Sequence, residues 1–357
     1  MPKDYFQFGI EAEFMLVNKD SYQPLWHRDL TFESLNKALE SATTSQNISL
    51  EGLELESPHT LLMPFAVEGY SLVDQDFKPI QLLPKGVEIR TPIHPSIEAC
   101  LDSLVSLHDS LQNELKKQGY LASSLSHHPI ETHFQGPPNK KRYDYWQWSM
   151  EVMTTYGPDF NISLPEDIAR TLNYKELDEK VNYYAPSMVA FSLASPFVEG
   201  QPWKIRGALG KSFRTYRRST VAPMIELHPE ENGRMEFKGF DMPWHLEDFH
   251  AYFLLWLTLL LDESLPGRAS KSSRIFDLGQ VARLGWEAET AQERASEVLD
   301  SAFATLPKWG FNTHPLLRLR ERLLHKTTPA DLLIQDYFIY GSLPETLRKL
   351  TCLYGAA

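Results

Sequence analysis

Hydrophobic and polar residues alternate along Tyr5–Val17, and this period of two predicts a β-strand. Residues two apart point to the same face of a strand. The even-numbered face is apolar and is expected to pack on the core; it carries Phe8, Ile10, Ala12, Phe14 and Leu16. The opposite face carries Glu11 and Glu13, so the first predicted strand presents two carboxylates on one side.

Strand patterns recur further along the chain, separated by turn signals. They predict strands over Phe65–Leu72, Pro79–Arg90, Asp159–Leu164 and a pair across Ile225–Phe240. Turns are expected at Asp74–Asp76, Pro84–Gly86 and Glu230–Gly233.

A period near 3.6 predicts the helices. The strongest pattern begins at Ser96 and ends at Gly119, and other helices are expected over 141–156, 178–195 and 246–261. Beyond Phe276 the chain is expected to be almost entirely helical. Strands first and helices later predict an α+β fold with a largely antiparallel sheet. We expect one domain over residues 1–357, with a helical C-terminal portion from about residue 270.

The composition is that of an ordinary globular protein, with 42% hydrophobic and 23% charged residues. A net charge of −12 argues against binding to nucleic acid or to a membrane surface. Cys100 and Cys352 are too few for a disulfide framework. No secretory signal is found, and the longest apolar run, Ala251–Leu261, is too short to span a membrane. The sequence therefore predicts a cytoplasmic location.

The charge is distributed unevenly. Residues 201–223 contain six Lys and Arg and no acid, whereas residues 1–100 contain seven basic and fifteen acidic residues. Such a basic segment either binds an anion or is a solvated loop. Arg214, Arg217 and Arg218 could hold phosphate through charge-assisted hydrogen bonds. The stretch GALGKS at 207–212 lacks the spacing of a P-loop.

Glutamates on predicted strands give the strongest chemical signal. Like charges about 7 Å apart on one face are unfavourable unless a cation lies between them, and Mg²⁺ prefers carboxylate oxygens. Glu88 and Glu236 lie in two further strand-like runs, each followed two residues later by a cation, Arg90 or Lys238. A solvated acidic face or local ion pairs would explain each residue alone. Together with the pair on the first strand, they favour a metal site.

Seven short motifs, in this order, resemble the glutamate–cysteine ligase family and its relatives, the bacterial carboxylate–amine ligases. They are GIEAE at 9–13, VEIRTP at 87–92, GPDFNISLP at 157–165, AFSLASPFVEG at 190–200, SFR at 212–214, MEFK at 235–238 and ARLG at 282–285. The resemblance implies a glutamine-synthetase-like fold, in which a curved antiparallel sheet forms a funnel with helices behind it. It also implies ATP and Mg²⁺, with Mn²⁺ as an alternative, as cofactors.

Site residues follow from this resemblance by position. The implied metal ligands are Glu11, Glu13, Glu88, Asp159, Glu236 and, with a neutral oxygen, Gln81. The implied catalytic residues, which would hold phosphate and acyl-phosphate oxygens, are Arg214 and Lys238. The nucleotide-binding set is Lys211, Arg214, Arg217 and Lys238.

Three positions depart from the family pattern. Asp159 stands where the ligases have a metal-binding His, Gln81 where they have a Glu, and Lys238 where they have an Arg. Two functions stay open. One is an ATP- and Mg²⁺-dependent ligase that joins a carboxylate, such as the γ-carboxyl of glutamate, to an amine through an acyl phosphate. The other is a non-catalytic relative that binds a nucleotide or metabolite. Retention of four strand glutamates favours the ligase, and a metal-dependent hydrolase is a more distant third.

Overall fold

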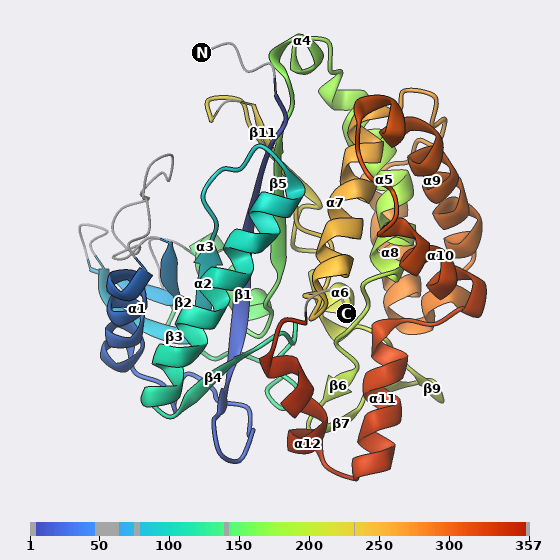
Figure 1. The fold of residues 1–357 in the computed structure, drawn as a ribbon. Helices are drawn as coiled ribbons and strands as arrows, with labels where there is room; N and C mark the ends of the chain where they lie inside the picture. Colours follow the sequence, from blue (N-terminus) through green and yellow to red (C-terminus); the bar gives the residue numbers. More distant parts are fainter. Residues whose placement is uncertain (1–4, 47–63, 75–78, 139–142, 232, 355–357) are drawn as a thin grey trace.

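A curled antiparallel sheet with helices packed against it forms the centre of the molecule (Figure 1). The structure, a computed structural model, describes residues 5–46, 64–74, 79–138, 143–231 and 233–354. The strand order is β10-β11-β5-β1-β3-β2, with β4 paired to β1. The strands are β1 (Gln7–Asn18), β2 (Phe65–Val73), β3 (Pro79–Arg90), β4 (Tyr120–Ser123), β5 (Pro158–Ser163), β10 (Ile225–His228) and β11 (Arg234–Phe237).

In the view of Figure 1, helices α1 and α2 lie at the left, and a bundle that includes α5 and α7–α10 lies at the right. The helices are α1 (Phe32–Gln46), α2 (Ile97–Lys117), α3 (Tyr143–Val152), α4 (Glu166–Ala169), α5 (Tyr174–Ala190), α6 (Phe213–Arg218), α7 (Leu246–Leu261), α8 (Lys271–Leu284), α9 (Ala291–Thr305), α10 (Leu316–His325), α11 (Pro329–Tyr340) and α12 (Leu343–Leu347). Two small hairpins pair β6 (Phe197–Val198) with β7 (Gln201–Pro202) and β8 (Lys204–Ile205) with β9 (Ala208–Leu209).

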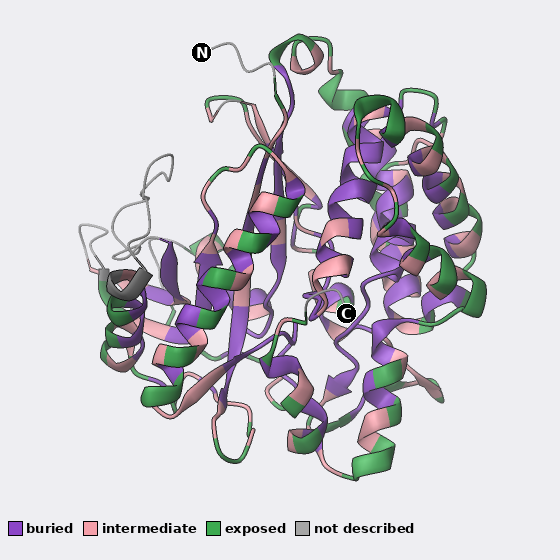
Figure 2. Cartoon of the chain, viewed as in Figure 1, coloured by how far each residue is buried: buried purple, intermediate pink, exposed green. Residues whose placement is uncertain are grey.

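One face of the sheet is the core. The even-numbered residues of β1 are buried as predicted, and the ring of Phe14 contacts His108 of α2. On β5, Phe160 packs edge-on against Phe253 of α7, with ring centroids 4.9 Å apart. Figure 2 shows α7 buried around most of its surface, whereas α2 buries one stripe. Because the core occupies this face, the odd-numbered side chains of β1 and β5 lie on the opposite face.

Most predicted elements are confirmed, including β2, β3, α2, α7 and the helical C-terminal part. The predicted turn at Pro84–Gly86 is wrong, because these residues lie inside β3. They pair with β2 at a register shift between Glu68 and Gly69. A Cβ at Gly69 would lie 2.2 Å from the Leu83 carbonyl oxygen, so glycine permits this close approach of the two strands.

Two helix boundaries and the basic segment also differ from expectation. The helix predicted over 178–195 is α5, which begins at Tyr174 and ends at Ala190 with Pro186 inside it. The helix predicted over 141–156 is the shorter α3. Residues 141–142 of that prediction lie outside the described residues, as do 75–76 and 232 of the turns predicted at Asp74–Asp76 and Glu230–Gly233. The basic segment 201–223 contains β7, the β8–β9 hairpin and α6. In the described ranges, no helix has the length and apolar character needed to cross a membrane.

Replacement of Ser96 by Ala is expected to lower the free energy of unfolding by about 1 kcal/mol. The Ser96 side chain caps α2 by accepting a hydrogen bond from the Ala99 amide at 3.2 Å. Ser96→Gly, the matched control, should lower it by only a few tenths of a kcal/mol. Urea denaturation measures both, and equal losses in the two variants would contradict a capping role.

Candidate active site

The open face of the sheet carries an excess of negative charge. Strand register places Glu13 opposite Glu88, Glu11 opposite Asp159, and Glu226 opposite Glu236. With Glu68 of β2, seven strand carboxylates lie on this face. The side-chain cations that contact them within 4 Å are Lys85, Arg90, Arg234 and Lys238. Among the described residues, seven acids against four such cations make this face attractive to further cations.

Glu11, Asp159 and Glu236 form a group of oxygen ligands. One carboxylate oxygen from each residue lies within 4.8 Å of the other two. Among the described residues, Glu11 has only long contacts, the shortest being 3.3 Å from the Asn161 amide nitrogen. Hard divalent cations such as Mg²⁺ prefer carboxylate oxygens. The residues present therefore suit such an ion, and three of the six predicted metal ligands come together here.

Electrostatics distinguish the members of this group. Burial and the neighbouring Asp159 raise the pKa of Glu236 to about 8. Burial alone would also raise the pKa of Asp159, but Lys238 and Arg218 outweigh it and lower that pKa. The ammonium of Lys238 lies 3.0 Å from Asp159 Oδ2 and 2.9 Å from Glu236 Oε1. Asp159 is therefore the compensated carboxylate, whereas the negative charge of Glu236 is destabilised.

The side chain of Lys85 supplies a positive charge beside Glu13. It donates a hydrogen bond to Glu13 Oε1 at 2.9 Å and another to the Thr155 carbonyl oxygen at 2.9 Å. The Gly157 amide donates to the other Glu13 oxygen at 3.2 Å. Because both carboxylate oxygens have donors, Glu13 is less open to metal coordination than Glu11, and its predicted role as a ligand stays a prediction.

Glu88 is similarly engaged. Its Oε2 lies 2.8 Å from Arg90 Nε, and it shares a hydrogen bond with Glu68 of β2. Burial and the charge of Glu68 raise the pKa of Glu88 well above its usual value. Gln81 is exposed on β3, seven residues before Glu88 and so roughly 23 Å away along an extended strand. The structure does not bring Gln81 to the oxygen group.

Arg214 is buried at the junction of three elements. Its guanidinium donates to the carbonyl oxygens of Lys238 at 3.2 Å and Gly239 at 3.3 Å, and it lies 3.6 Å from Asp241 Oδ1. It packs against Gly157, where a Cβ would lie 2.0 Å from Nη2. Burial and the nearby Arg218 lower the pKa of Arg214 to about 10.

A small pocket lies beside this arginine. Its charged lining residues are Arg214, Arg218 and Lys238, and Met224 and Leu278 supply part of its apolar wall. Arg218 donates to the Thr155 hydroxyl at 3.3 Å. These cations form a basic corner, which we define as Arg214, Arg218 and Lys238, next to Asp159 and the oxygen group.

The other predicted nucleotide-binding residues have partners away from the sheet face. Lys211 Nζ lies 2.6 Å from Asp331 Oδ1 of α11, and Arg217 Nη2 lies 2.7 Å from Glu151 Oε2 of α3. Acids distant in sequence thus neutralise part of the basic segment. A nucleotide-binding role for Lys211 and Arg217 stays a prediction.

Sequence reasoning missed several residues of this face. Glu68 lies in a strand that was predicted. The alternation of side chains along that strand, compared with the neighbouring strands, is the signal that would have placed Glu68 on this face. Lys85 was hidden by the wrong turn at Pro84–Gly86. Arg234 contacts Glu11 at 3.5 Å and Asn161 Oδ1 at 2.7 Å, which no local pattern reveals.

Comparison with solved structures shows the class to which this fold belongs. Glutamate–cysteine ligase from Francisella tularensis, in complex with AMP, superposes with a TM-score of 0.64 over 98% of this chain and 89% of that chain, at 11% identity. A bifunctional glutathione synthetase from Pasteurella multocida gives a TM-score of 0.63 over 98% and 52% of the two chains, at 12% identity. The predicted fold, shared with glutamate–cysteine ligase and related ligases, is confirmed.

The chain belongs to glutamate–cysteine ligase family 2 (GCS2), whose family model matches residues 7–220. The match includes Glu11 and Asp159 and ends before Glu236. Glutamate–cysteine ligase of Haloquadratum walsbyi is 25% identical over 187 residues, which are 51% of this chain and 45% of that protein. A Chromobacterium violaceum protein with the provisional name glutamate–cysteine ligase 2 is 21% identical in an alignment of 389 positions. That alignment covers 96% of this chain and 93% of that protein. The chain thus spans less than half the length of the Haloquadratum walsbyi protein and nearly all of the Chromobacterium violaceum protein.

The metal-free protein is expected to lose stability as pH rises from about 5 to 8. Folded Glu236 keeps its proton up to a pKa of about 8, whereas an unfolded glutamate loses it near 4.5. The unfolded state then binds fewer protons, so the free energy of unfolding falls with pH. Thermal denaturation in a chelator should show a shallower fall for Glu236→Gln. Parallel pH profiles would contradict the raised pKa.

Lys85→Met is expected to lower the free energy of unfolding by about 3–5 kcal/mol, because it leaves Glu13 without its buried cation. The Lys85 side chain is 7% exposed. Adding Glu13→Gln should recover part of the loss. Lys117→Met, which removes an ion pair from a lysine that is 65% exposed, is the control and should change stability by less than about 1 kcal/mol. Equal losses for Lys85 and Lys117 in urea denaturation would refute the buried pair.

Proposed function

We propose that this chain is an ATP- and Mg²⁺-dependent carboxylate–amine ligase that forms a γ-glutamyl or similar amide through an acyl phosphate. The observation that carries the proposal is the oxygen group Glu11, Asp159 and Glu236 next to the basic corner. An acidic group suited to a divalent cation and a basic group suited to phosphate thus share one end of the sheet face. Family membership supports the same reaction class.

The reaction needs a leaving group better than hydroxide. A substrate carboxylate oxygen attacks the γ-phosphorus of ATP and ADP departs; the amine nitrogen then attacks the acyl carbon, phosphate departs and the amine loses a proton. Mg²⁺ held by Glu11, Asp159 and Glu236 would neutralise phosphate oxygens. Lys238 can donate to a phosphoryl oxygen from its place between the two groups.

Arg214 serves this reaction mainly through position. It donates to the carbonyl oxygens of Lys238 and Gly239 and so fixes the backbone that carries the Lys238 ammonium, while its buried Nε has no hydrogen-bond partner among the described residues. Arg218 donates to the Thr155 hydroxyl and has further N–H donors, so it is the guanidinium better placed to reach a bound anion. The basic corner would therefore combine one fixed and two donating cations.

The second candidate is a family member that binds a nucleotide or metabolite without turnover. Lys85 on Glu13 and Lys238 on Asp159 favour it, because both lysines occupy carboxylates that the family resemblance assigns to metal. The ligase reading is preferred because Glu11 remains loosely held and open to an ion.

Glu11→Gln is expected to reduce Mg²⁺-dependent phosphate release from ATP about 100-fold or more, while the melting temperature stays near that of wild type. Release is measured with glutamate and a panel of amines. Glu98→Gln, on the exposed side of α2, is the control and should keep wild-type turnover. Full turnover in Glu11→Gln would remove the oxygen group from the mechanism. Nucleotide binding by wild type without release under any condition would favour the second candidate.

A further inference from the structure

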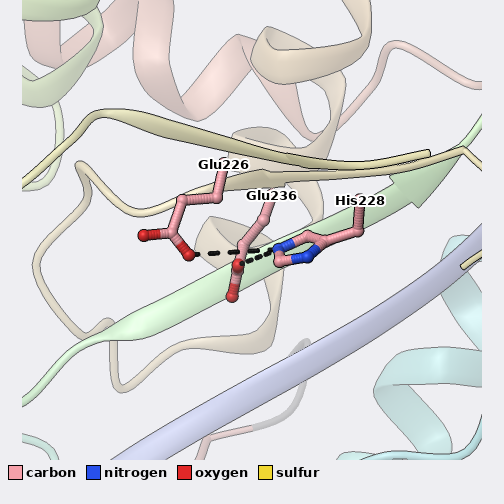
Figure 3. Close-up of side chains that lie close together, drawn as sticks. All are labelled: Glu226, His228 and Glu236. Atoms are coloured by element: carbon pink, nitrogen blue, oxygen red, sulfur yellow. Dashed lines mark hydrogen bonds and ion pairs between the residues drawn. The ribbon is translucent and has the colours of Figure 1, made fainter. Parts of the chain in front are cut away.

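The β10–β11 hairpin carries a second set of ligands at the edge of the sheet. Glu226 and His228 are two residues apart on β10 and share a face, and Glu236 is the register partner of Glu226 on β11. Figure 3 shows the three side chains converging. His228 Nε2 lies 3.3 Å from Glu236 Oε2 and 3.9 Å from Glu226 Oε2.

These separations are close to those around a bound ion. One ligand atom from each residue lies within 4.8 Å of the other two. A tetrahedral ion with bonds of about 2.1 Å holds its ligand atoms roughly 3.4 Å apart. Small side-chain rotations would therefore be enough to enclose an ion. An imidazole nitrogen with two carboxylates suits Zn²⁺, Co²⁺ or Mn²⁺, whereas Mg²⁺ prefers oxygen ligands alone.

The far side of the imidazole supports this orientation. His228 Nδ1 lies 3.7 Å from Glu231 Oε1, and Arg234 Nε holds Glu231 through a 2.6 Å contact. Metal-bound histidines commonly direct their other ring N–H to a carboxylate. Nε2 hydrogen-bonds Glu236 Oε2 at 3.3 Å, and an ion bound between these two atoms would replace that hydrogen bond with coordination.

Two cations lie beside the proposed ligand atoms. Lys238 contacts Glu236 Oε1 at 2.9 Å and Glu226 Oε2 at 3.5 Å, and Arg234 Nη1 lies 3.6 Å from Glu236 Oε2, so a bound ion would replace the two longer contacts. The side chains of Glu226 and His228 are 43% and 24% exposed, so an ion can reach them from solvent, whereas Glu236 is 3% exposed and fixed.

We propose that Glu226, His228 and Glu236 bind one borderline divalent ion, with Zn²⁺ preferred over Mg²⁺. Glu236 belongs both to this edge site and to the oxygen group. Carboxylates that join two metal positions are a familiar arrangement in enzymes that act on phosphate. The edge site does not depend on the ligase reaction, because its ligands recognise the ion itself.

The test is calorimetric titration of Zn²⁺ into the whole chain, in a large excess of Mg²⁺ and without nucleotide or amino acid. Wild type should bind one Zn²⁺ that Mg²⁺ does not displace. His228→Ala, with His228→Gln as the more conservative variant, should weaken this binding roughly tenfold or more. His314→Ala, an exposed histidine on the far helical part, is the matched control. Co²⁺ absorption in the same variants reports whether nitrogen coordinates the ion.

Three results would overturn the proposal. Wild type could bind no Zn²⁺ under these conditions, or His228→Ala could bind as wild type does. Loss of binding in His228→Ala but not in Glu226→Gln would place the ion on the other ring nitrogen, near Glu230 and Glu231. None of these results bears on phosphate release with Mg²⁺, so failure of the edge site and failure of the proposed ligase are distinguishable.

Discussion

Mutual repulsion among the carboxylates on the open face of the sheet is the constraint to which the rest of the site responds. Register places Glu13 opposite Glu88 and Glu11 opposite Asp159, positions at which like charges destabilise a sheet. The strands cannot turn these residues elsewhere, because a change of one residue in register would bury the acids and expose Phe8 and Ile10. The buried core thus holds the acids together, and cations must offset their repulsion.

Cations divide this face into two halves. Around Glu13 and Glu88, Lys85 and Arg90 supply short, largely buried contacts that offset part of the repulsion, although burial and Glu68 still raise the pKa of Glu88 well above its usual value. Around Glu11 and Glu236, the contacts are longer or are shared with Lys238, and the pKa of Glu236 rises to about 8. The oxygen group, which has the longer contacts, therefore lies toward β5 and β11, where the basic corner also lies.

The sequence was sufficient for the parts of this arrangement that depend on local periodicity. The alternation in Tyr5–Val17 predicted which face of β1 carries acids, and the shared pattern predicted the same for Glu88 and Glu236. Side-chain pairing was not predictable, because it depends on tertiary neighbours: Lys85 meets Glu13 from 72 residues away, and Lys211 meets Asp331 from 120. The turn signal at Pro84–Gly86 misled because Gly69 on the partner strand absorbs the irregularity inside the sheet.

Two departures from the resemblance form one physical unit. An aspartate at position 159, where the family resemblance implies a histidine, adds a negative charge to a face that is already acidic. Lys238, on the neighbouring strand end, contacts Asp159 and Glu236 together and offsets that charge. A lysine point charge can bridge two carboxylates, whereas an arginine fork matches one of them best. His228 on the next strand then places an imidazole beside Glu236, at a distance of 3.3 Å. Lys238 thus offsets part of the charge that Asp159 adds, and the imidazole of His228 lies on β10, which is separated from the strand of Asp159 by β11.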